Sequence, residues 1–172
     1  MSIELANYIH AVPDFPKPGI LFRDISPLLS SPEAFSFAIE VMARHVEALG
    51  VSGLVAIESR GFLFGAPLAM RTKIPLVLVR KRGKLPGERE SVEYGLEYGV
   101  DRLEIKKGVL PERSRVVVVD DVLATGGTAA ATGELVTKVG GVVAGYIFLI
   151  ELAALGGRGK LEGVLVESVV RF

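Results

Sequence analysis

The sequence predicts an α/β fold in which a mainly parallel central sheet is flanked by helices. Two observations lead to this prediction: continuous apolar runs such as 53–57 and 116–119 end in polar or glycine-rich turns, and helical stretches separate them. Strands without polar alternation are buried on both faces, which is typical of parallel sheets covered by helices. At 172 residues, the whole chain, 1–172, is predicted to form one domain.

The first predicted element is a helix that begins after Ser31 and ends before Gly50. Ser31 is a typical N-cap, Pro32 suits the first turn, and Glu33 places an acid near the positive end of the helix dipole. Apolar residues then recur every three or four positions, and Gly50 stands where a C-cap belongs.

The remaining elements alternate between strands and helices. Expected in order are strand 53–57, turn 58–61, helix 62–71, strand 75–79, a basic loop, strand 116–119, turn 120–128, an alanine-rich helix to about Val139, and strands 142–150 and 164–170. Ligands of such sheets bind at the carboxyl ends of the strands, and the three unusual loops follow strands there.

Two segments depart from this alternation. Residues 11–28 hold four of the nine prolines and predict a rigid irregular arm. Residues 80–99 combine four closely spaced cations with Pro86 and several glycines, and a loop of about 20 residues in a small domain is typical of a lid or binding element. We expect short hairpin strands within it.

Composition excludes several classes of protein. Twenty basic residues balance twenty acidic ones, which argues against nucleic-acid binding. The absence of cysteine and the presence of only two histidines argue against thiolate and histidine-rich metal sites. The apolar runs are too short to span a membrane, and the N-terminus has no basic stretch leading into an apolar block. We therefore expect a cytoplasmic protein without membrane or nucleic-acid partners.

The strongest chemical signal is the turn 120–128. A strand that enters a glycine-rich turn and then a helix N-terminus makes an anion site from main-chain N–H groups, and Thr125 and Thr128 add hydroxyl donors. Neither the Walker pattern nor the dinucleotide fingerprint occurs in the chain. Asp120 and Asp121 lie just upstream of the glycine-rich part of this turn and suit the hydroxyls of a sugar phosphate. The alternative is that Asp121 caps the turn and Asp120 faces solvent.

The stretch 116–128 closely resembles the signature with which phosphoribosyltransferases bind 5-phosphoribosyl 1-diphosphate (PRPP). Segments 13–27, 57–65 and 80–99 resemble the N-terminal arm, diphosphate loop and flexible catalytic loop of the adenine-specific members of that family. The resemblance implies the type I phosphoribosyltransferase fold, with a base-binding arm (hood) at about 11–28 and a hairpin lid at about 80–99. It implies transfer of the phosphoribosyl group from PRPP to adenine, giving AMP and diphosphate in purine salvage.

The resemblance also implies roles for individual residues. The diphosphate would be bound by Ser59, Arg60, Lys81 and Lys84, the ribose by Asp120 and Asp121, the 5-phosphate by Ala124, Thr125, Gly126, Gly127 and Thr128, and adenine by Leu21, Phe22 and Arg23. Glu97 would handle a proton of the base, with Arg60 as the second catalytic residue, and Tyr98 would help to close the lid. The bond Glu58–Ser59 would be cis, as it often is in that family.

The resemblance further implies Mg²⁺ as cofactor and a homodimer. The metal would be held through substrate oxygens, with Asp120 and Asp121 as the protein ligands available to it, because the sequence has no dedicated metal cage. Two alternatives stay open: a non-catalytic PRPP sensor, and an enzyme for xanthine, hypoxanthine or orotate. Phe22 has the alternative of being an ordinary core residue, and Gly95 stands where relatives often carry a polar residue.

Overall fold

The computed structural model describes residues 3–95 and 100–172, and the chain divides into two units, residues 1–41 and 42–172. The expectation of a single domain stays a prediction. Across the described residues, no helix is both long and apolar enough to cross a membrane.

The first unit contains a two-stranded sheet where we expected an irregular arm. Its elements are η1 (Leu5–Tyr8), β1 (His10–Pro13), β2 (Leu21–Asp24), α1 (Ser26–Leu29) and the first part of α2 (Pro32–Leu49). β1 and β2 pair antiparallel, with Val12 opposite Phe22. The expectation was wrong here because the prolines lie mainly at the end of β1 and in the loop between the strands, where they do not interrupt the pairing.

The start of α2 follows the predicted capping chemistry. The Ala34 N–H donates a hydrogen bond to Ser31 Oγ at 3.2 Å, so Ser31 satisfies one of the donors that the first turn leaves unpaired. Pro32 is the first helical residue and Glu33 lies in the first turn. The helix ends at Leu49, and Gly50 follows with a positive φ of 57°.

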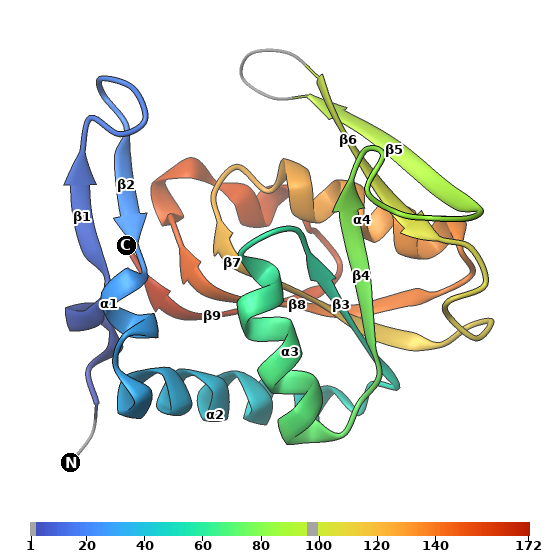
Figure 1. The fold of residues 1–172 in the computed structure, drawn as a ribbon, viewed down its shortest axis with the longest axis horizontal. Helices are drawn as coiled ribbons and strands as arrows, with labels where there is room; N and C mark the ends of the chain where they lie inside the picture. The colour runs from blue at the N-terminus through green and yellow to red at the C-terminus, as the bar shows by residue number, and fades with distance from the viewer. Residues whose placement is uncertain (1–2, 96–99) are drawn as a thin grey trace. The chain divides into compact units, whose positions relative to one another are not determined.

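The second unit is built around a seven-stranded sheet (Figure 1). Its order is β5-β6-β4-β3-β7-β8-β9, in which β4, β3, β7, β8 and β9 are parallel, β6 is antiparallel to β4, and β5 is antiparallel to β6. The elements are β3 (Gly53–Ile57), α3 (Gly61–Thr72), β4 (Leu76–Lys81), β5 (Arg89–Gly95), β6 (Val100–Lys106), β7 (Arg115–Leu123), α4 (Gly127–Lys138), β8 (Val142–Glu151), η2 (Ala153–Leu155), η3 (Gly157–Lys160) and β9 (Leu165–Arg171).

Two helices cover opposite faces of this sheet. A Cβ on Gly65 of α3 would come within 2.6 Å of the Ala56 Cβ, so α3 packs closely on the face to which Ala56 points. A Cβ on Gly133 of α4 would come within 2.2 Å of the Tyr146 hydroxyl. The register aligns Ala56 with Ile147 through β7, and successive strand residues face opposite sides, so Tyr146 and α4 lie on the other face (Figure 1).

The predicted strands and helices of this unit are confirmed, with two corrections. β3 is buried along its whole length, as a central parallel strand should be. β7 runs beyond the expected 116–119 to Leu123, so Asp120 and Asp121 lie in the strand and not in a turn. β4 alternates, with Leu78 36% exposed between two buried valines. The expected lid contains the hairpin strands β5 and β6.

Candidate active site

The carboxyl ends of three neighbouring strands, β4, β3 and β7, converge on one edge of the sheet. A cavity of about 290 Å³ lies there, and it is lined by Glu58, Ser59, Arg60, Lys81, Tyr94, Asp120, Asp121, Val122, Ala124 and Thr128. A smaller cavity of about 80 Å³ shares four of these residues and is lined otherwise by residues 123, 125–127 and 129. The strand order therefore creates a continuous polar site at the position where α/β sheets bind ligands.

The loop after β7 presents the open N-terminus of α4 to the smaller cavity. Gly126 adopts φ 78° at the N-cap position, and no side chain caps the first turn. The first-turn N–H groups, together with the helix dipole, favour an oxyanion at this end. The phosphate-binding role of residues 124–128 stays a prediction, and this uncapped helix N-terminus supports it.

The segment around Gly157 packs against this loop, although no sequence pattern pointed to it. A Cβ on Gly126 would lie 2.4 Å from the Gly157 carbonyl oxygen, and a Cβ on Gly157 would lie 2.3 Å from the Ala124 carbonyl oxygen. Arg158 anchors this segment by two hydrogen bonds of 2.7 Å to the buried Glu151 carboxylate. Backbone therefore packs directly on backbone, which only glycine allows at both positions.

The two aspartates are packed tightly at the end of β7. Asp121 is 4% exposed, and its Oδ2 lies 2.7 Å from Arg60 Nε. This contact is an ion pair and not a directed hydrogen bond, since that buried oxygen has no hydrogen-bond donor among the described residues. A Cβ on Gly61 would come within 2.8 Å of Asp120 Oδ1, so glycine there lets α3 begin beside the pair.

Burial raises the pKa of both aspartates. For Asp120 the neighbouring Asp121 charge raises the pKa further, and it lies well above the ordinary value of 3.8. For Asp121 the Arg60 guanidinium opposes the effect of burial, which still dominates the pKa. The pair is therefore poorly solvated as it stands, and it is suited to hydroxyl donors or a cation. Asp121 lies buried within β7 and so does not merely cap the turn, whereas Asp120 is half-buried and lines both cavities.

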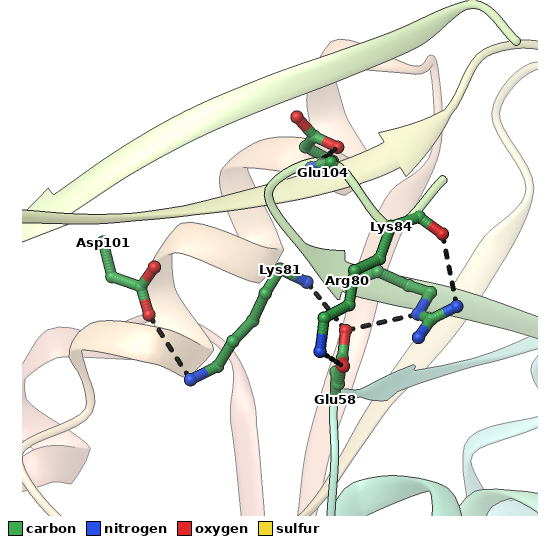
Figure 2. Close-up of polar contacts among 7 residues, drawn as sticks. Glu58, Arg80, Lys81, Lys84, Asp101 and Glu104 are labelled. Carbon is green, nitrogen blue, oxygen red and sulfur yellow. Dashed lines mark hydrogen bonds and ion pairs between the residues drawn. The ribbon is translucent and has the colours of Figure 1, made fainter. Parts of the chain in front are cut away.

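A basic segment, residues 80–84, is organised by two glutamates (Figure 2). The Glu58 carboxylate accepts hydrogen bonds from Lys84 Nζ at 2.7 Å, the Lys81 N–H at 2.9 Å and Arg80 Nε at 3.2 Å. Burial opposes ionisation of Glu58, but these hydrogen bonds outweigh it and lower its pKa to about 2. The buried Glu104 accepts from the Gly83 N–H at 3.0 Å.

The hairpin adds a tyrosine to the larger cavity. The Tyr94 hydroxyl donates a hydrogen bond to Asp101 Oδ2 at 3.2 Å, and the same oxygen lies 3.6 Å from Lys81 Nζ. Burial raises the pKa of Tyr94, which also has a side-chain hydrogen bond with Thr128 of α4. Tyr94 and Asp101 face one another across the hairpin register, a relation that no local sequence pattern reveals.

The structure brings most of the predicted site residues to these cavities and leaves others apart. Ser59, Arg60, Lys81, both aspartates and residues 124–128 line them. Lys84 pairs with Glu58. The bond Glu58–Ser59 is cis, as expected. Leu21, Phe22 and Arg23 form most of β2 in the first unit, where the Phe22 ring meets Phe15 edge to face at 5.1 Å. Glu97 and Tyr98 lie outside the described residues.

Comparison with known proteins agrees with this geometry. A family model described as the phosphoribosyl transferase domain matches residues 30–163. The adenine phosphoribosyltransferase of Synechococcus sp. (strain CC9605) is 54% identical over 171 residues, which cover 99% of each chain.

Solved structures are similar over nearly the whole chain. The crystal structure of adenine phosphoribosyltransferase from Thermoanaerobacter pseudethanolicus is 51% identical, with a TM-score of 0.95 over 98% of both chains. The enzyme of Saccharomyces cerevisiae, solved with an iminoalditol bisphosphate and adenine, is 44% identical, with a TM-score of 0.92 over 96% of both chains.

Proposed function

The chain belongs to the phosphoribosyl transferase family, among its adenine phosphoribosyltransferases, and from that premise we propose how its residues carry out the reaction. The enzyme transfers the 5-phosphoribosyl group of PRPP to N9 of adenine and releases AMP and diphosphate, a step of purine salvage. One observation carries the assignment of the site: an uncapped helix N-terminus and the Asp120–Asp121 pair line the same cavities, and Arg60 forms an ion pair with the buried Asp121.

The three parts of PRPP match three parts of this edge. We assign the 5-phosphate to residues 124–128, where main-chain N–H groups converge. The ribose hydroxyls donate to Asp120 and Asp121, and the diphosphate faces Ser59, Arg60 and the lysines of the basic segment. Because these loops follow the adjacent parallel strands β3 and β7, the sheet sets their spacing, and a ligand that spans them is bound in one orientation.

The reaction breaks the bond between the anomeric carbon and the diphosphate oxygen while N9 of adenine forms the new bond. Positive charge develops on the ribose, as it does in glycoside hydrolysis. The adjacent carboxylates stabilise that charge, and Arg60 and Lys81 stabilise the charge on the departing diphosphate. Adenine is assigned to Leu21, Phe22 and Arg23, with the Phe22 ring as a stacking surface and main-chain groups near Leu21 reading the 6-amino group. Tyr98 is assigned to closure over the site.

The residues at this edge fit a magnesium ion that is held mostly by substrate. Among the described residues Asp121 Oδ2 has no directed hydrogen-bond donor, and Asp120 lies beside it, so a hard cation would compete with Arg60 for Asp121 Oδ2 or take the other oxygens of the pair. The described residues contain no cluster of three or more metal-ligating side chains, so the substrate's oxygens would have to complete the shell. When bound, Mg²⁺ neutralises the diphosphate as it leaves.

Base specificity is tested with adenine, hypoxanthine, guanine and orotate, each with PRPP and Mg²⁺. We expect adenine to be preferred by about 10⁴, because a main-chain carbonyl that accepts from the 6-amino group, once covered by the base, would face the oxo group of hypoxanthine. Comparable turnover of hypoxanthine would contradict the specificity. PRPP binding without turnover of any base would instead support a non-catalytic sensor.

Glu97 is proposed as the group that accepts the proton adenine loses. Glu97→Gln is expected to lower kcat about a hundredfold or more while the Kd of PRPP stays nearly unchanged, because a general base acts only in the transition state. Rapid-quench kinetics and calorimetry measure the two quantities. Glu93→Gln, a charge change on the described part of the hairpin, serves as control and should leave both unchanged. A Glu97→Gln enzyme with normal kcat would remove this role.

We further propose that the enzyme is a cytoplasmic homodimer without membrane or nucleic-acid partners. The high apolar content of a short chain supports an interface between copies, and the balance of 20 basic and 20 acidic residues argues against a nucleic-acid partner. Sedimentation velocity distinguishes a dimer from the 18.4 kDa monomer.

A further inference from the structure

Each cation assigned to the diphosphate already has a carboxylate partner in this structure. Arg60 pairs with Asp121 at 2.7 Å, Lys84 with Glu58 at 2.7 Å and Lys81 with Asp101 at 3.6 Å. A diphosphate must therefore compete with the protein's own carboxylates for these cations. The three pairs differ in how much their separation would cost.

The Glu58 pair is expensive to break. The Glu58 side chain is 6% exposed, and its carboxylate is shared by three donors from the basic segment. If Lys84 left, a nearly buried carboxylate would lose its shortest hydrogen bond. The Arg60 pair is similar, since the side chain of its partner Asp121 is also 6% exposed.

The Lys81 pair is the weak one. The side chains are 52% and 26% exposed, and the separation of 3.6 Å is the longest of the three. Both Asp101 oxygens have other donors: the Tyr94 hydroxyl reaches Oδ2 at 3.2 Å, and the Arg102 N–H reaches Oδ1 at 2.8 Å. The carboxylate therefore stays hydrogen-bonded when Lys81 leaves.

The backbone of Lys81 is fixed although its side chain is not. Its N–H is bonded to Glu58 at the end of β4, and its side chain runs away from Glu58 toward Asp101 (Figure 2). Lys81 lines the larger cavity, and it can therefore turn toward a ligand without moving the strand.

We propose that Asp101 is the resting counter-ion of Lys81 and that Lys81 is the cation that leaves its carboxylate partner for the diphosphate, whereas Arg60 and Lys84 stay paired with Asp121 and Glu58 while they face it. The proposal rests on the proposed function. Asp101 is thus a positioning residue: it holds Lys81 and Tyr94 at the cavity in the free enzyme, and its charge competes with the ligand.

The test is a double-mutant cycle, with inorganic diphosphate and Mg²⁺ titrated into the full chain by calorimetry. Asp101→Asn is expected to bind diphosphate about threefold to fivefold more tightly, because an exposed ion pair contributes about that much and the diphosphate no longer has to replace it. Lys81→Met is expected to bind about tenfold more weakly. In the Lys81→Met background, Asp101→Asn should change nothing, since the cation for which it competes is gone.

Two further variants make the outcome decisive. Asp101→Ser also removes the charge and should move binding in the same direction. Glu93→Gln removes a carboxylate that pairs with Arg102 on the opposite face of the same hairpin, and it should leave binding unchanged. The proposal is overturned if both Asp101 variants bind diphosphate more weakly than the wild type or equally well. It is also overturned if Asp101→Asn tightens binding by the same factor in the Lys81→Met background. A wild-type chain that binds neither PRPP nor diphosphate would instead overturn the proposed function.

Discussion

Replacing Asp120 and Asp121 together by asparagine is expected to weaken PRPP binding by at least about a hundredfold. A hydrogen bond to a charged acceptor contributes about 1.5–3 kcal/mol, and the double variant weakens two of them. Asparagine preserves shape, and its oxygen can still accept the bond that Asp120 Oδ1 takes from the Asp121 N–H at 2.9 Å. Calorimetric titration with PRPP and Mg²⁺ measures the loss.

The same substitution should stabilise the free protein at neutral pH. Burial raises the pKa of both carboxyls in the folded state, so the unfolded chain ionises at lower pH than the folded one. Stability is therefore lost as the pH rises above the ordinary value of 3.8 and stays lost above the folded pKa. Asparagine does not ionise, so the double variant should keep this stability. Its thermal midpoint should exceed that of the wild type near pH 7, by about 2–4 °C for each kcal/mol gained in the free energy of unfolding, and the two midpoints should converge near pH 3.

A matched control separates these effects from a general change of charge. Glu134→Gln removes a carboxylate that is exposed on α4 and paired with Lys138, so PRPP affinity and the pH dependence of the midpoint should stay as in the wild type. The assignment of the ribose to the aspartate pair is untenable if the double variant binds PRPP as the wild type does. A midpoint that falls at pH 7 would show that the pair holds the fold together.

The parts of this fold that were predictable are those encoded by neighbouring residues. The four valines at 116–119 and the apolar run 53–57 predict central strands, and Ser31 followed by Pro32 predicts the start of a helix. The glycine-rich turn predicts an anion site because the main-chain N–H groups that form such a site come from consecutive residues. Even there, the strand extends through Asp120 and Asp121, since a strand's end is set by its neighbour β8 and not by polarity.

The parts that were not predictable depend on contacts between distant residues. The Glu58 side chain meets the basic segment 22 to 26 positions later, and Asp101 meets Tyr94 only through hairpin register. The role of Gly157 depends on a segment 31 residues earlier in the chain, against which it packs. Sequence periodicity does not reveal such pairings. The contacts of Glu58 with the basic segment, and of Gly157 with the phosphate-binding loop, are therefore seen only in the structure.

The contact of Gly157 with the phosphate-binding loop leads to the other large effect we expect: Gly126→Ala should lower the affinity for AMP by about a hundredfold or more. Gly126 has φ 78°, which costs an L-residue about 1–2 kcal/mol by itself. The new Cβ would also lie 2.4 Å from the Gly157 carbonyl oxygen, so the loop or segment 157–160 must shift. Displacement of a phosphate-binding loop by about 1 Å is enough for a loss of this size.

Gly163→Ala isolates the cost of the dihedral angle from the cost of the contact. Gly163 has φ 79°, almost the value at Gly126, but a Cβ there meets no atom within 4 Å. Both variants should lose thermal stability through strain, and only Gly126→Ala should lose AMP in a calorimetric titration. If Gly163→Ala weakened AMP binding as much, backbone strain alone would explain the result. If Gly126→Ala bound AMP normally, the helix N-terminus could not be where the phosphate lies, because the main-chain N–H groups of a displaced loop cannot keep the geometry that an oxyanion requires.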